Sequence, residues 1–186
     1  MINVIVVIRI RSFAAILLVS VAFVNMACSA KAGLYKVYRD QSCGFEFRYP
    51  SDGKLIRIAS GADRVDLPFV SGTTLCDKYI LINVSSGRED SPGDGLQING
   101  MKLKFELGSE GAAGSIYDFI RCTVTFADRC QIVLTFVLHS VNPEMFDSPP
   151  PAFDRAKEVL PFWLILASLR PLPDGSSPGN YPHAGK

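Results

Sequence analysis

The sequence predicts an α+β domain in which a mainly antiparallel β-sheet packs against a C-terminal helix. Apolar residues repeatedly occupy every second position between residues 45 and 139, the pattern of strands with one buried face. Between Phe153 and Ser168 they recur at helical spacing instead. A series of strands followed by a terminal helix is typical of an α+β fold.

Residues 1–30 have the pattern of a cleavable secretory signal peptide. Arg9 and Arg11 supply basic charge, and residues 13–24 form an uncharged apolar run. That run is about half of the ~20 residues that a membrane-spanning helix requires. We therefore expect a secreted or periplasmic protein that keeps no stable membrane span after the signal is removed.

The small residues that follow the apolar run allow cleavage after Ala30 or Ala32. The alternative is an envelope lipoprotein in which Cys28 is acylated. Asn25 and Met26 stand where such a signal prefers an aliphatic and a small residue. This favours simple cleavage over lipidation at Cys28.

Residues 31–170 are long enough for one domain with a substantial core, and residues 171–186 read as a disordered tail. Loss of Arg9 and Arg11 with the leader changes the formal charge from +1 to −1. A near-neutral surface without basic clusters argues against nucleic acid as a partner. The expected partner is an unidentified protein or small ligand.

Four cysteines remain after the leader, and an even number in an exported chain predicts disulfides. Three pairings are compatible with the sequence. Cys122 and Cys130 flank a predicted hairpin and are candidates to face each other, which would leave Cys43 to pair with Cys76. Free buried thiols are the alternative to disulfides, and metal binding is disfavoured because no C-x2-C spacing is present.

The predicted strands begin with an alternating run that ends in a turn at residues 50–53. Residues 55–58 look like the returning strand. Residues 65–70 look like another short strand, which Pro68 makes either an edge strand or an irregular piece. Residues 78–85 read as a central strand. The polar segment 87–95 is predicted to be a loop.

A two-faced strand is predicted from Met101 to Leu107, and a flexible loop over residues 108–114. The strongest element is a hairpin that joins residues 116–126 to residues 130–139. Asp154 lies near the predicted start of the final helix, where an acidic side chain interacts favourably with the helix dipole. Pro161 lies inside this helix and predicts a kink or a restart there.

Four segments together resemble the PsbP-like proteins, which are related to an accessory subunit of photosystem II. Residues 43–50 resemble the family's opening GF-x-F-x-YP strand, and residues 72–75 resemble a Gly-Thr-x-Leu loop. Residues 117–134 are similar to a late hairpin, and residues 165–170 to a closing helix-to-strand segment. The resemblance implies an α/β/α sandwich around an antiparallel sheet, used for binding or assembly. Residues matching the cation or partner sites of the photosystem protein are absent, so photosynthetic function is not carried over.

Catalytic signatures are sparse. His139 ends an apolar strand and His183 lies in the tail, and a Ser-His-Asp site would lack a Gly-x-Ser-x-Gly elbow. The glycines at 108, 111 and 114 lack the Lys-Ser/Thr ending of a phosphate loop. No catalytic, cofactor-binding or metal residue is therefore assigned.

The sequence favours a non-enzymatic exported domain that binds its ligand at a loop end of the sheet. The alternative is a secreted hydrolase that uses loop carboxylates such as Asp90, Asp94 or Glu110. Asp90 and Asp94 also have oxygens of the type that Ca²⁺ prefers, but they lack the EF-hand pattern.

Overall fold

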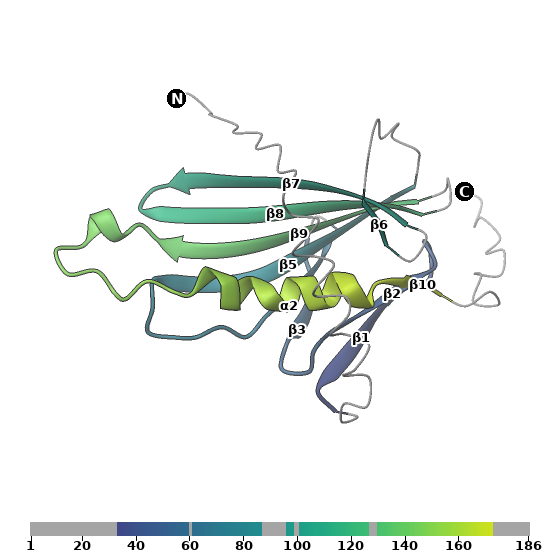
Figure 1. The fold of residues 1–186 in the computed structure, drawn as a ribbon, viewed down its shortest axis with the longest axis horizontal. Helices are drawn as coiled ribbons and strands as arrows, with labels where there is room; N and C mark the ends of the chain where they lie inside the picture. The colour runs from purple at the N-terminus through teal and green to yellow at the C-terminus, as the bar shows by residue number, and fades with distance from the viewer. Residues whose placement is uncertain (1–32, 60, 87–95, 99–100, 127–129, 173–186) are drawn as a thin grey trace.

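A computed structural model of the chain describes residues 33–59, 61–86, 96–98, 101–126 and 130–172. These residues form two antiparallel sheets and one α-helix of fourteen residues, so the fold is α+β and dominated by sheet (Figure 1). The strands are β1 (Tyr35–Asp40), β2 (Phe45–Pro50), β3 (Lys54–Arg57), β4 (Asp63–Asp66), β5 (Leu75–Ser86), β6 (Leu96–Ile98), β7 (Met101–Ala112), β8 (Ser115–Phe126), β9 (Cys130–Val141) and β10 (Arg170–Pro171). A short 3-10 turn (Pro143–Met145) precedes helix α2 (Arg155–Ser168).

The large sheet has the strand order β3-β4-β5-β9-β8-β7-β6, and the small sheet has the order β1-β2-β10. The predicted hairpin is confirmed as β8 and β9, whose register runs from Ser115 opposite Val141 to Phe126 opposite Cys130. The predicted central strand is β5, which lies between β4 and β9.

Helix α2 lies across one face of the large sheet, in front of it in Figure 1. It begins at the predicted position, where the Asp154 side chain accepts a hydrogen bond from the backbone N–H of Lys157. Its buried face packs over the sheet, and the rings of Phe162 and Phe136 stack at 5.1 Å. Strand β2 packs on the same side, so α2, β2 and the large sheet share one core.

The core joins side chains from both sheets and from the helix. Its largest fully buried members are Phe45, Phe47, Ile80, Ile82, Leu103, Ile132, Leu134, Phe136, Leu138, Phe162, Ile165 and Leu169. The predicted common face of β9 is confirmed, because its even-numbered residues from 130 to 138 are all buried.

Polar contacts connect the large sheet to helix α2 and to the small sheet. The Lys78 ammonium in β5 lies 2.5 Å from a carboxylate oxygen of Glu158 in α2, and both side chains are almost fully buried. The Tyr38 hydroxyl in β1 donates to Asp63 in β4 at 2.8 Å. Burial, and then the hydrogen bond to Asp63, raise the pKa of Tyr38.

The small sheet is held by Glu46 in β2, which binds arginines from both neighbouring strands. Arg39 Nε lies 2.8 Å and Arg170 Nε lies 2.7 Å from its two carboxylate oxygens. These hydrogen bonds, first that of Arg39, lower the pKa of Glu46.

Several sequence predictions were wrong about strand partners. Residues 54–57 do not return along β2 but enter the large sheet beside β4. Strand β4 is paired on both sides and ends before Pro68, because Pro cannot donate to a sheet ladder. The predicted flexible loop at residues 108–114 is mostly the end of β7, and the chain turns at Ala113–Gly114.

The C-terminal predictions also need correction. Helix α2 neither ends nor restarts at Pro161, and the carbonyl that loses its helical partner belongs to the exposed residue Lys157. The folded domain extends past residue 170, since Pro171 lies opposite Phe45 and the Leu172 N–H donates to the Gly44 carbonyl. The rest of the predicted tail and the predicted leader lie outside the described residues.

The predicted disulfide pairing was wrong. The bond joins Cys43 to Cys130, with a Cα–Cα distance of 5.6 Å, and Cys76 and Cys122 are free. In the β8–β9 ladder Cys122 lies opposite Leu134, four residues from Cys130, or about 13 Å along the strand. Cys130 instead meets the loop that precedes β2, because the small sheet packs on that side.

Candidate functional site

The large sheet has one covered face and one open face. In β5 the side chains of Lys78, Ile80 and Ile82 point to the core, so Tyr79 and Leu81 point the opposite way. No helix or strand among the described residues packs on this opposite side. We call it the open face; the residues used below are Arg64, Asp66, Asp77, Tyr79, Gly108, Ser115, Tyr117, Phe119, Val137 and His139.

Aromatic and charged side chains gather at one end of the open face, where β5 begins and β9 ends. The register aligns Asp77, His139, Tyr117 and Glu110 in one row across β5, β9, β8 and β7. The next row contains Asp66, Tyr79, Val137 and Phe119. This cluster lies at a loop end of the sheet.

Arg64 is the fixed cation of this cluster. Its Nε lies 2.5 Å from Asp66 Oδ1, its terminal nitrogen lies 2.6 Å from Asp77 Oδ2, and its guanidinium lies 3.8 Å above the Tyr79 ring centroid. Partial burial works to lower the pKa of Arg64, but the two carboxylates outweigh it and the pKa is raised. The arginine therefore stays charged and keeps one orientation.

His139 occupies the centre of the row rather than an isolated strand end. Its ring stacks on Tyr117 with centroids 4.4 Å apart, and its Nε2 lies 3.1 Å from Ser115 Oγ. The neighbouring carboxylate in the register, Asp77, binds Arg64 instead. Among the described residues the Ser115–His139 contact is therefore not extended by Asp77 into a Ser-His-Asp arrangement.

Gly108 shows how closely the open face is packed. A Cβ built at this position would lie 2.2 Å from the tip of the Phe119 ring, so the ring rests on the bare backbone of β7. The glycine that the sequence analysis assigned to a flexible loop is therefore required by a side-chain contact. Phe119 lies beside Val137, which is 6% exposed although no described helix or strand packs over it.

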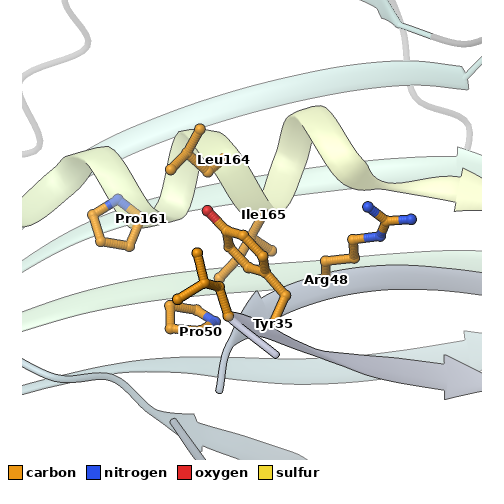
Figure 2. Close-up of a pocket in the computed structure, with 7 residues that line it drawn as sticks. Tyr35, Arg48, Pro50, Pro161, Leu164 and Ile165 are labelled. Carbon is orange, nitrogen blue, oxygen red and sulfur yellow. The ribbon is translucent and has the colours of Figure 1, made fainter. Parts of the chain in front are cut away.

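A separate apolar groove lies on the other side of the molecule, between α2 and the β1–β2 pair (Figure 2). Its volume is about 190 Å³. We call it the α2–β1 groove; it is lined by Leu34, Tyr35, Arg48, Pro50, Pro161, Leu164 and Ile165. Figure 2 shows the Tyr35 ring between Pro50 and the helix residues, with the Arg48 side chain extending to one side.

A second hollow, of about 340 Å³, adjoins the buried Lys78–Glu158 pair. Residues 68–70, which follow β4, form its other wall, and the Val70 N–H lies 3.3 Å from Glu158 Oε1. The ammonium and the carboxylate bind each other. Neither of these two charged groups is therefore available to bind a ligand in this hollow.

Of the other candidate residues from the sequence, Glu110 is exposed on β7 and lies in the same row as His139. Asp90, Asp94, His183 and Cys28 lie outside the described residues. No group of three or more His, Cys, Asp or Glu side chains suited to a metal occurs in the described ranges. No helix among those residues is both long and apolar enough to span a membrane.

Sequence reasoning missed Arg64, Tyr79, Asp77, Tyr117 and Ser115 as a group. The available signal was the second face of the strands: large aromatic residues occupy outward positions of β5 and β8, where short polar residues are usual in an open sheet. Their convergence depends on the strand order, which the sequence did not reveal.

The two free cysteines differ in their environment. Cys122 is buried in the core, and burial raises the pKa of its thiol to about 12. Cys76 is exposed at the irregular start of β5. We therefore expect iodoacetamide to modify Cys76 in the native protein and to leave Cys122 unmodified, because the thiolate is the reactive form. Peptide mapping by mass spectrometry checks this, with Cys76→Ser as the control; native modification of Cys122 would contradict it.

No family model matches the chain, and no curated protein sequence matches it. Among solved structures, a protein of Bacteroides thetaiotaomicron has a similar fold, with a TM-score of 0.52 and 14% sequence identity. The similarity covers 76% of this chain and 50% of that protein, so this chain spans half the length of its neighbour. At this identity the likeness shows the fold alone.

Proposed function

We propose that the protein is an exported, non-enzymatic binding domain that holds a protein partner or small ligand on the open face of its large sheet. The observation that carries this proposal is the row of aromatic and charged side chains at the loop end of that face. Rings that pack against fixed charges provide contact area and directional hydrogen bonds at little entropic cost.

Export is supported by the Cys43–Cys130 disulfide, since such bonds form and persist in oxidising compartments. With the predicted leader, this favours a secreted or periplasmic protein. The lipoprotein alternative at Cys28 places the same domain on the envelope.

Kinship with the PsbP-like proteins is part of the proposal. Two of the four segments that resemble the family are neighbours in space: β2 packs against α2, and β10 pairs with β2. The mainly antiparallel sheet with a C-terminal helix fits this kinship. A complete α/β/α sandwich would have a second helical layer over the open face, and no described helix lies there, so the proposed kinship rests on the sheet and the C-terminal helix alone.

Site-specific photocrosslinking tests the binding face. A photoreactive phenylalanine replaces Tyr117 on the open face or, as the matched control, Leu107, which is 53% exposed and points to the opposite face of the same sheet. In the native cell envelope or medium we expect a discrete adduct from position 117 that is absent from position 107. The change Arg64→Gln should weaken that adduct.

Equal adducts from both positions, or none from position 117, would contradict the binding proposal. A catalytic role has its own test, because the contact between Ser115 and His139 is the one arrangement that favours a hydrolase. If purified protein hydrolyses ester or peptide substrates and His139→Ala abolishes the turnover, the non-enzymatic proposal is wrong.

A further inference from the structure

The α2–β1 groove lies within a wider patch of exposed apolar side chains. Leu34 is 52% exposed, Tyr35 45% and Leu164 38%. Leu160 extends the patch along the helix, because it lies one turn before Leu164, and Val37 extends it along β1, because it follows Tyr35 on the same face of the strand. Large apolar residues from two elements thus meet at one surface, which marks an interaction site rather than scattered exposure.

The chain enters the domain at this surface. Gly33 is the first described residue, and Leu34 is already part of the groove. Cys28 and Leu34 are six positions apart in the sequence, and even a fully extended segment of that length spans about 20 Å or less. An acyl group on Cys28 would therefore keep the groove close to the membrane.

The composition of the groove suits a lipid interface. Leucines, prolines and an isoleucine form its walls, Tyr35 brings an amphipathic ring, and Arg48 brings a cation on a long apolar stem. Tyrosine and arginine are the side chains that place an apolar body near acyl chains and a polar tip at the headgroups. No acidic residue lines the groove, so nothing in it opposes the lipid phosphates.

We propose that the α2–β1 groove docks the protein onto the phospholipid surface of the envelope membrane. Leu34 and Leu164 enter the boundary between headgroups and acyl chains, and Arg48 binds lipid phosphates. The open face of the large sheet then points away from the bilayer and remains accessible to its partner. Membrane docking and the proposed binding function use different residues, so either can fail without the other.

Vesicle flotation tests this docking. The full chain carrying Cys28→Ser is exported, recovered and weighed by mass spectrometry, so that an acyl group does not contribute to binding. It is mixed with vesicles of phosphatidylethanolamine and phosphatidylglycerol, or of phosphatidylcholine alone. We expect flotation with both, weakened but retained at high salt, because apolar contact supplies most of the affinity.

The variants Leu34→Asp and Leu164→Asp should each lower the partition coefficient by about tenfold or more, the factor expected for losing one apolar side chain from the contact. Leu107→Asp is the matched control. Leu107 is 53% exposed, within a per cent of Leu34, and it does not line the groove. Circular dichroism and the unfolding midpoint show that each variant is folded.

Three outcomes overturn the proposal. The Cys28→Ser protein fails to float; the groove variants float as well as the control; or Leu34→Asp changes the oligomeric state in size-exclusion chromatography while vesicles bind nothing. The last result would assign the groove to a second copy of the chain. Binding carried by a retained leader is recognised from the mass and from groove variants that float unchanged.

Discussion

Replacing Lys78 with methionine should lower the free energy of unfolding by about 3–5 kcal/mol. The ammonium of Lys78 is 2.5 Å from Glu158, and their side chains are 3% and 6% exposed. Without the lysine, Glu158 keeps one weak contact at 3.3 Å, from the Val70 N–H, and must be buried without a countercharge or become protonated. Urea denaturation of the wild type and the variant measures the loss.

A second pair of variants distinguishes the loss of the countercharge of Glu158 from the loss of a lysine side chain as such. Lys157→Met removes an exposed lysine beside Glu158 and should change stability by no more than about 0.5 kcal/mol. The double variant Lys78→Met with Glu158→Leu removes both charges and should recover most of the loss, because a buried ion pair contributes little over an apolar pair. A double variant as unstable as the sum of the two single ones would contradict this account.

Removing the Cys43–Cys130 disulfide should lower the free energy of unfolding by about 2–5 kcal/mol. The bond joins residues separated by 87 positions, and the chain-entropy model gives about 4.6 kcal/mol for a loop of that length. It also holds the loop before β2 against the start of β9, so the small sheet should loosen first. Chemical denaturation of Cys43→Ala with Cys130→Ala, compared with wild type, measures the effect.

The control for the disulfide is Cys76→Ala, which removes an exposed free thiol and should leave stability nearly unchanged. Non-reducing peptide mapping identifies the pairing itself. A peptide pair linking Cys122 to Cys130, or Cys43 to Cys76, would contradict the structure and restore the pairing that the hairpin first suggested.

The sequence predicted those elements whose signal is local. The hairpin of β8 and β9 was predicted because alternation persists over ten residues on each side of a short turn. The start of α2 was predicted because Asp154 and the change of period stand together. In both cases neighbouring residues carry the information, and tertiary packing agrees with it.

Only the general location of the candidate site could be predicted from the sequence. A loop end of the sheet was predicted as the binding region, and His139 was identified as the one histidine within the folded part. Its partners Ser115 and Tyr117 come from the next strand, while Arg64 and Asp77 come from two others. The residues adjacent to His139 in the sequence give no indication that these four side chains lie near it.

The sequence by itself determined the class of fold, the alternating strands, the helix and the presence of cysteines able to form disulfides. The tertiary structure decided which strands pair, which cysteines bond and which face of the sheet stays open. The division has a physical cause: period and propensity depend on adjacent residues, whereas strand order and Cα–Cα distances depend on how distant segments share one core. Cys130 therefore bonds a residue 87 positions away rather than the cysteine across its own hairpin.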